Sequence, residues 1–157
     1  MCIRDRSYLA INGTTGYPGV TYITHFMFRS QAPDGTLTAD NVYAVVLLGP
    51  YSGANEQVTK ARFLKNVDGN NKVLATRDLV VALDPRTWYK VRCTWWVSQG
   101  VLIVRVEYFD GSEWVKLCDD FTDTANNWAD SATNRVGLSG YGYYGCWWDD
   151  TIIYAPV

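Results

Sequence analysis

The sequence has a single histidine, His25, and no Cys-x-x-Cys pair among its four cysteines. These residues are the usual zinc ligands, so a zinc site is not expected. No apolar stretch approaches the roughly eighteen residues that a membrane-spanning helix needs. No segment shows the apolar spacing of an amphipathic helix either. The chain therefore lacks the signatures of a zinc protein, of membrane insertion and of a helical domain.

Charge is also scarce. Charged residues make up 19% of the 157 residues, and the 16 acidic residues outnumber the 14 basic ones. Proteins that bind nucleic acid usually present a basic face, so nucleic acid is not an expected partner. Hydrophobic residues reach 48%, which excludes disorder as the main state, and there are seven Trp and eleven Tyr. This excess of aromatic residues is the first indication of function.

The first six residues read MCIRDR and lack the apolar core of a signal peptide. They resemble the translated sequencing-adaptor remnant that ends some metagenomic reading frames. We therefore expect residues 1–6 to be a non-native tail. Residues 7–157 are then expected to form one domain that has lost its own N-terminus.

Apolar residues alternate with polar ones or form short β-branched and aromatic blocks, which is the pattern of strands. Turn residues such as Asp68-Gly69 and Gln99-Gly100 separate the blocks. Many strands without helices predict an all-β fold, either a barrel or, as we prefer, an antiparallel two-sheet β-sandwich of the jelly-roll kind. The expected strands are 8–12, 20–29, 42–48, 60–66, 72–76, 79–83, 88–98, 101–109, 113–118, 134–140 and 146–155.

The strongest local pattern is an antiparallel meander over residues 88–118. In its first strand an apolar face alternates with a mixed face that carries Arg92 and Trp96. In its second strand the mixed face carries Arg105 and Glu107. We expect the apolar faces to lie on a core and the mixed faces toward water. The polar stretch 119–133 is expected to be a functional loop or to hold a short helical turn.

Apart from Cys2, the cysteines are Cys93, Cys118 and Cys146, so at most one internal disulfide forms. We expect Cys93 to be a small core residue. A disulfide between Cys118 and Cys146 remains open. The tryptophans expected in the core are Trp95, Trp114 and one of Trp147 and Trp148.

Three stretches carry a family resemblance, and they occur in order. They are TWYKVR at 87–92, VRVEYFDGSEW at 104–114, and RVGL at 135–138 followed by WDDTII at 148–153. Together they resemble the concanavalin A-like lectin/glucanase domains, which include laminin-G-like and carbohydrate-binding jelly rolls. The resemblance implies two curved sheets with ligand on the concave sheet or at its rim. It also implies a module of a larger extracellular or virion-surface protein, with neighbouring domains as partners, from an uncultured microbe or phage.

A catalytic role is not expected. Retaining glucanases of this superfamily carry an E-x-D-x-x-E strand motif, and its lyases carry Q-x-H with a Tyr base. After position 6 the only glutamates are Glu56, Glu107 and Glu113, and none forms the glucanase motif. No Gln stands two residues before His25. If the chain is instead a fragment of a glycan-cleaving enzyme, Glu107 and either Asp120 or Glu56 should converge in a groove.

Sugars stack on aromatic rings and hydrogen-bond to planar polar side chains. Such residues are found on the mixed strand face and in the glycine-interrupted segment 141–148. We therefore expect a non-catalytic carbohydrate-binding or adhesion module that binds a glycan or polysaccharide. The alternative is a structural or protein-interaction domain, in which the same aromatics are buried or form a protein–protein patch. The candidate ligand residues are Arg92, Trp96, Arg105, Tyr141, Tyr143 and Trp147.

A structural Ca²⁺ ion is the one cofactor considered. By the resemblance, Asp149 matches an aspartate that binds Ca²⁺ in related sandwiches, together with carbonyls from the N-terminal strand. Strict alternation along the strand leaves Asp150 open as the ligand instead. Because Ca²⁺ takes about six to eight oxygen ligands, either aspartate needs several partners.

Overall fold

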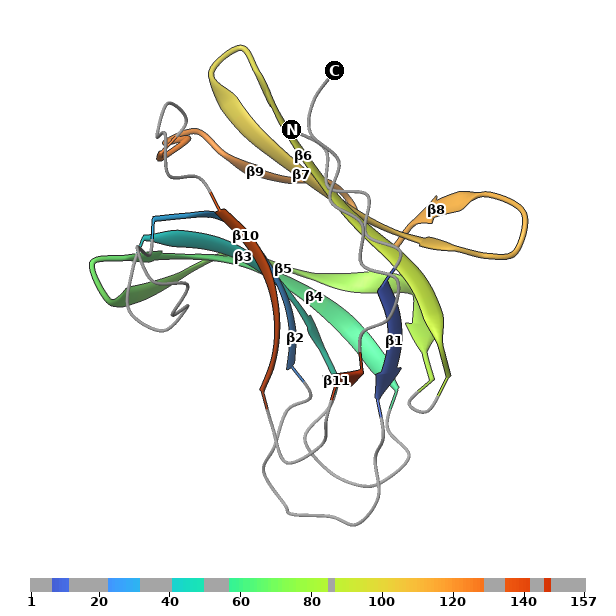
Figure 1. Ribbon diagram of the computed structural model, residues 1–157. Coiled ribbons are helices and arrows are strands. Elements are labelled where there is room, and N and C mark those ends of the chain that lie inside the picture. Colours follow the sequence, from blue (N-terminus) through green and yellow to red (C-terminus); the bar gives the residue numbers. More distant parts are fainter. Residues whose placement is uncertain are drawn as a thin grey trace.

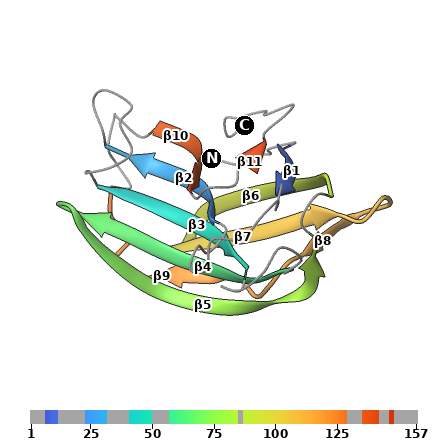
Figure 2. The same ribbon diagram turned by 90° about the horizontal axis from the view of Figure 1, so that it is seen from below.

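The structure is a computed structural model that describes residues 7–11, 23–31, 41–49, 57–84, 87–128, 135–141 and 146–147. Over these ranges the chain forms two antiparallel sheets and no helix, which confirms the predicted all-β sandwich. Figures 1 and 2 show the sheets packed face to face. The strands are β1 (Ser7–Ile11), β2 (Ile23–Ser30), β3 (Val42–Leu48), β4 (Val58–Val67), β5 (Asn70–Leu83), β6 (Tyr89–Ser98), β7 (Val101–Phe109), β8 (Trp114–Lys116), β9 (Phe121–Asp123), β10 (Arg135–Tyr141) and β11 (Cys146–Trp147).

The first sheet has the strand order β11-β1-β6-β7-β8, and β9 also pairs with β7. The predicted meander of β6, β7 and β8 forms the end of this sheet that lies away from β11. Gln99 and Gly100 turn the β6–β7 hairpin with φ angles of 51° and 79°. Two successive positive φ angles suit the right-handed twist of paired strands, which is why glycine is favoured at such a turn.

The second sheet has the order β10-β2-β3-β4-β5. All seven residues of β3 are buried, as in a central strand that is covered on both faces. β5 is a single strand of 14 residues, whereas the sequence predicted separate strands at 72–76 and 79–83. Its pairing with β4 shifts register at two irregularities. These bulges let one strand continue through residues 77–78, where the sequence pattern had separated two strands.

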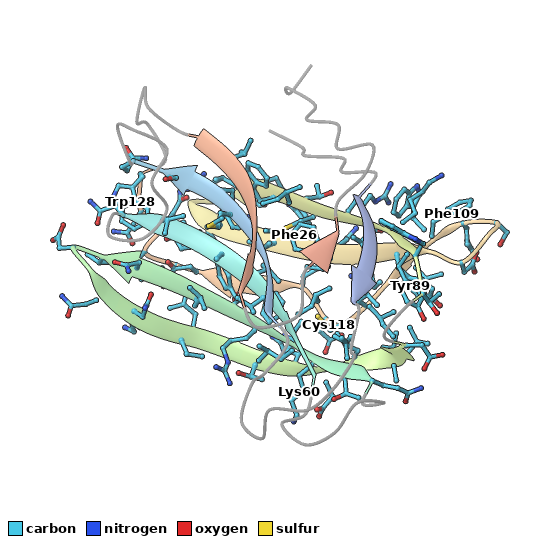
Figure 3. The ribbon with its side chains drawn as sticks, turned by 60° about the horizontal axis from the view of Figure 1, so that its bottom comes forward. Phe26, Lys60, Tyr89, Phe109, Cys118 and Trp128 are labelled. Atoms are coloured by element: carbon cyan, nitrogen blue, oxygen red, sulfur yellow. The ribbon has the colours of Figure 1, made fainter. Side chains whose placement is uncertain are left out.

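A stacked aromatic core fills the space between the sheets. The ring of Phe28 lies 4.6 Å from that of Trp95 on the opposite sheet and 5.6 Å from that of Tyr43. Figure 3 shows Phe26 within this layer as well. Trp95 and Cys93 are buried as predicted, with exposed fractions of 4% and 1%. The alternation within β6 is therefore confirmed.

The segment between β8 and β9 joins the two sheets at one edge. The Leu117 N–H donates to the Val106 carbonyl of β7, and the Leu117 carbonyl accepts the Val80 N–H of β5, at 2.9 and 2.8 Å. The next strand, β9, lies inside the stretch 119–133 that was expected to be a loop or a helical turn. Its residue Phe121 is fully buried and supplies the apolar contact that a free loop lacks.

One expectation for the core is wrong, and one open question about it is answered. Trp114 stands opposite Phe109 on the side of the sheet that points away from the core, and it is only half-buried. Strand register placed it there, whereas the prediction had relied on its size. Cys118 is buried as a thiol and is therefore not joined to Cys146.

Candidate functional site

Three predicted ligand residues, Arg92, Trp96 and Arg105, lie on one surface of the first sheet. Their neighbours in the chain, such as Cys93 and Val104, point into the core, so these three point away from it. We call this surface the outer face. Other residues on this face include Lys90, Thr94, Ile103, Glu107, Phe109, Trp114, Lys116 and Asp120.

At one end of the outer face, Arg92 lies between a carboxylate and an aromatic ring. Its Nε and Nη2 donate to the two oxygens of Glu107 at 2.5 and 2.9 Å. Its guanidinium carbon lies 4.3 Å from the centre of the Trp114 ring. The Arg92 and Glu107 side chains are 18% and 8% exposed. A flat guanidinium both pairs with a carboxylate and stacks on a ring, which makes this end rigid and largely closed.

A second cluster of the same kind lies further along β7. Arg105 donates from Nε and Nη2 to both oxygens of Asp120 at 2.9 and 2.7 Å, and its guanidinium lies 5.1 Å from the centre of the Trp96 ring. Lys116 reaches the same carboxylate at 3.1 Å. The hydrogen bond from Arg105 is the main reason why the pKa of Asp120 falls below its usual range.

This second cluster is the more accessible of the two. The side chains of Arg105, Asp120 and Lys116 are 32%, 21% and 47% exposed, and Trp96 is half-buried. A planar ion pair, a second cation and an indole ring are thus available to solvent on one strand surface. Such a set of groups can hydrogen-bond to hydroxyls and stack on a flat apolar face.

The remaining predicted site residues are not brought to the outer face by any described contact. Tyr141 ends β10 in the second sheet, and Trp147 pairs with Ala10 at the β11 edge of the first sheet. Only their backbones are described, so the orientations of their side chains stay predictions. Tyr143, Asp149 and Asp150 lie outside the described residues.

Two of the carboxylates considered for catalysis, Glu107 and Asp120, are paired with basic side chains. Glu107 accepts from Arg92, and Asp120 accepts from Arg105 and Lys116. Glu56 lies outside the described residues. Both described carboxylates are therefore tied to cations that lie on the same face.

A buried polar cluster at the other end of the molecule was not predicted from the sequence. Figure 3 places Trp128, which belongs to it, at the opposite end from Phe109. Lys65 Nζ lies 2.9 Å from Oδ2 of Asp123, and the Tyr43 hydroxyl donates to the same oxygen at 2.5 Å. The exposed fractions are 7% for Lys65, 9% for Asp123 and zero for Tyr43. Charges this deep need close partners, which the cluster supplies.

The segment after β9 completes the cluster. Asn127 accepts from Lys65 Nζ at Oδ1 over 3.0 Å, and its backbone N–H donates to the Tyr43 hydroxyl over 2.9 Å. Arg29 holds the same segment through the Asn126 side chain and the Asn127 carbonyl, at 2.5 and 3.2 Å. Burial raises the pKa of the Tyr43 hydroxyl, and its bond to Asp123 raises it further. Only the polar composition of 119–133 had hinted at a role for this segment.

A cleft of about 330 Å³ lies where β5 meets the β8–β9 connection. Arg77 lines it, and the buried Nε of that side chain has no hydrogen-bond partner. No predicted ligand residue lies on this cleft. Its other lining residues are Thr76, Asp78, Val80, Cys118 and Asp119.

Within the described ranges, no three His, Cys, Asp or Glu side chains gather in a way that could hold a metal ion. The same part of the chain contains no helix long and apolar enough to span a membrane. Comparison of the sequence with protein-family models and with curated proteins, and of the fold with solved structures, returns no match.

Proposed function

We propose that this protein is a non-catalytic carbohydrate-binding or adhesion module whose ligand lies on the outer face. The observation that carries the proposal is the stacking of Arg105 on Trp96 while Arg105 also holds Asp120 in a two-bond pair. An indole beside fixed planar donors and acceptors offers the two kinds of contact that a sugar ring makes.

The pairing favours binding because the polar groups are already fixed. Arg105 and Asp120 hold each other in one geometry, so less conformational freedom is lost when a hydroxyl binds to them. Lys116 adds a donor at the most exposed point of the cluster. We propose that the sugar stacks at Trp96 and that the Arg92–Glu107 end supports the sheet.

The resemblance to concanavalin A-like domains adds support, since two antiparallel sheets of this kind are what it implies. With it we propose an extracellular or virion-surface setting, beside further domains of a larger protein. Asp149, or Asp150 in its place, is proposed as the ligand of a structural Ca²⁺. The alternative, a protein-interaction domain, would use the same exposed side chains against a protein surface.

Affinity electrophoresis tests the proposal. The chain is run through native gels that contain different polysaccharides, first with calcium and then with a chelator. We expect selective retardation by one polymer, a loss of about tenfold or more in affinity for Trp96→Ala, and a smaller loss for Trp96→Phe, which keeps a ring. Loss of retardation in the chelator would support the Ca²⁺ site.

Arg105→Ala and Arg62→Ala form a matched pair of variants. Both remove an arginine from a strand, but Arg62 lies on the second sheet and contacts Thr76. We expect only Arg105→Ala to weaken retardation. If none of the polymers retards the folded wild-type protein, the proposal of glycan binding is wrong. The hypothesis of a protein-interaction domain then replaces it.

A further inference from the structure

The buried cluster contains the parts needed to join two side chains covalently. Lys65 Nζ is a nucleophile once it is neutral, and it lies 3.0 Å from Oδ1 of the Asn127 amide. The atom that it would attack, Cγ, is bonded directly to that oxygen. Asp123 lies 2.9 Å from the same Nζ and can take its proton. A fixed contact at this distance raises the effective concentration of the amine at the amide by orders of magnitude.

We propose that Lys65 and Asn127 form an intramolecular isopeptide bond, with Asp123 as the acid and base that promotes it. This proposal is independent of glycan binding, because the cluster and the outer face share no residue. The bond links β4 of the second sheet to the segment that follows β9 of the first.

The reaction is balanced within the three side chains. The Lys65 ammonium gives one proton to the Asp123 carboxylate, and the neutral amine then forms the Nζ–Cγ bond. Asp123 protonates the departing Nδ2 and takes the second proton from Nζ. The Cγ–Nδ2 bond breaks, one ammonia leaves, and Asp123 remains as a neutral carboxyl. No oxidant or further reactant takes part.

The surroundings favour this reaction in two ways. The Tyr43 hydroxyl gives its one proton to Asp123 while that carboxylate is ionised. Once Asp123 has taken the Lys65 proton, the hydroxyl can donate instead to Oδ1 of Asn127, 3.4 Å away, which becomes negative when Nζ attacks. The product also replaces a buried ion pair by a neutral amide. An ion pair that is less than a tenth exposed is costly to keep out of water, so its removal favours the product.

Aromatic rings limit the access of water to the site, in which Asn127 itself is half-buried. Trp128 packs edge-on against Tyr43 with ring centres 5.2 Å apart, and Phe63 stacks on Tyr43 at 5.6 Å. Lys65 Nζ lies 5.8 Å from the centre of the Tyr43 ring. Limited access of water protects the amide from hydrolysis.

The mass of the intact, denatured and reduced protein tests the proposal. We expect the full-length chain to be lighter than its sequence by the mass of one ammonia molecule. After trypsin, peptide 63–72, uncut at Lys65, should be joined to peptide 117–135, with fragmentation placing the link at Lys65 and Asn127. A succinimide formed at a single asparagine also loses ammonia, but it joins no two peptides.

Variants separate the roles of the three residues. Lys65→Arg, Asn127→Ala and Asp123→Asn should each show the full mass of their sequences. The control Lys60→Arg should keep the loss, because Lys60 pairs with Asp78 on an exposed part of β4. A wild-type mass equal to that of its sequence overturns the proposal by itself. Loss of one water with a link between Lys65 and Asp123 overturns the assignment of Asn127.

Discussion

Arg92 and Glu107 face each other across the β6–β7 ladder and are joined by two hydrogen bonds of 2.5 and 2.9 Å. The Glu107 side chain is only 8% exposed although it points away from the core. The two ends of the outer face therefore differ in kind. The Arg92 end is closed over Trp114 and holds the sheet together, and the Arg105 end is open and available to a ligand.

Replacing Glu107 by glutamine should destabilise the fold. The change leaves the Arg92 guanidinium, which is 18% exposed, without its charge partner. Breaking a largely buried pair from one side costs about 3 kcal/mol. Urea unfolding measures this cost, and Glu113→Gln, at an exposed position, serves as the control with a change within about 0.5 kcal/mol. Equal stabilities of the two variants would show that the Arg92 pair contributes nothing.

Acid should destabilise the protein partly through Asp120. Its pKa is lowered in the folded state, mainly by the hydrogen bond from Arg105, so the unfolded state binds protons more readily. The stabilisation is complete above the ordinary carboxyl pKa of about 4 and is lost as the pH falls through the lower folded value. Asp120→Asn should therefore show a shallower loss of stability in acid.

Thermal unfolding followed from pH about 6 down to about 2 measures this difference. Asp78→Asn is the control, because the Asp78 side chain is 83% exposed. An acid dependence that is as steep in Asp120→Asn as in the wild type would contradict the assignment.

Removing the Tyr43 hydroxyl should cost more than removing an exposed one. Tyr43→Phe leaves the Asn127 N–H without its buried acceptor and takes one donor from Asp123. An unsatisfied buried group costs roughly 1–3 kcal/mol. Tyr89→Phe loses only an exposed bond from the Asp84 N–H, which water can replace. Similar unfolding free energies for the two variants would contradict the buried hydrogen bonds of the Tyr43 hydroxyl.

The two buried thiols should react only after unfolding. Cys93 and Cys118 are 1% and 3% exposed, and burial raises the pKa of Cys118 to about 11. Little Cys118 thiolate is therefore present at neutral pH, and although Cys118 lines the cleft beside β5, almost none of its surface is open to a reagent. Alkylation followed by peptide mapping should label both residues in denaturant and neither in the native protein. Rapid labelling of Cys118 in the native state would contradict the packing around β8 and β9.

The alternation of side chains made most of the first sheet predictable. In β6 and β7 a period of two separates Cys93 and Trp95 from Arg92 and Trp96 without any knowledge of the other sheet. The same reasoning failed for Trp114, because β8 has only three residues and is too short to show a period of two. Size then suggested the core, but pairing with Phe109 decided the face.

The buried cluster could not be predicted because its members are far apart in the sequence. Tyr43, Lys65 and Asp123 meet only once β3, β4 and β9 are in place. Each residue alone is ordinary: a tyrosine in an apolar strand, a lysine in an alternating strand and an aspartate in a polar stretch. Long-range pairing of this kind is set by topology, and topology is what local patterns specify least.

The central claim, that a sugar stacks at Trp96, is tested most directly by following the indole N–H signals of the tryptophans in an NMR titration. The titrants are oligosaccharides cut from each polysaccharide used in the gels. We expect the Trp96 signal to shift and saturate while the signal of the buried Trp95 stays in place. Saturable binding that leaves the Trp96 signal unmoved would contradict the account.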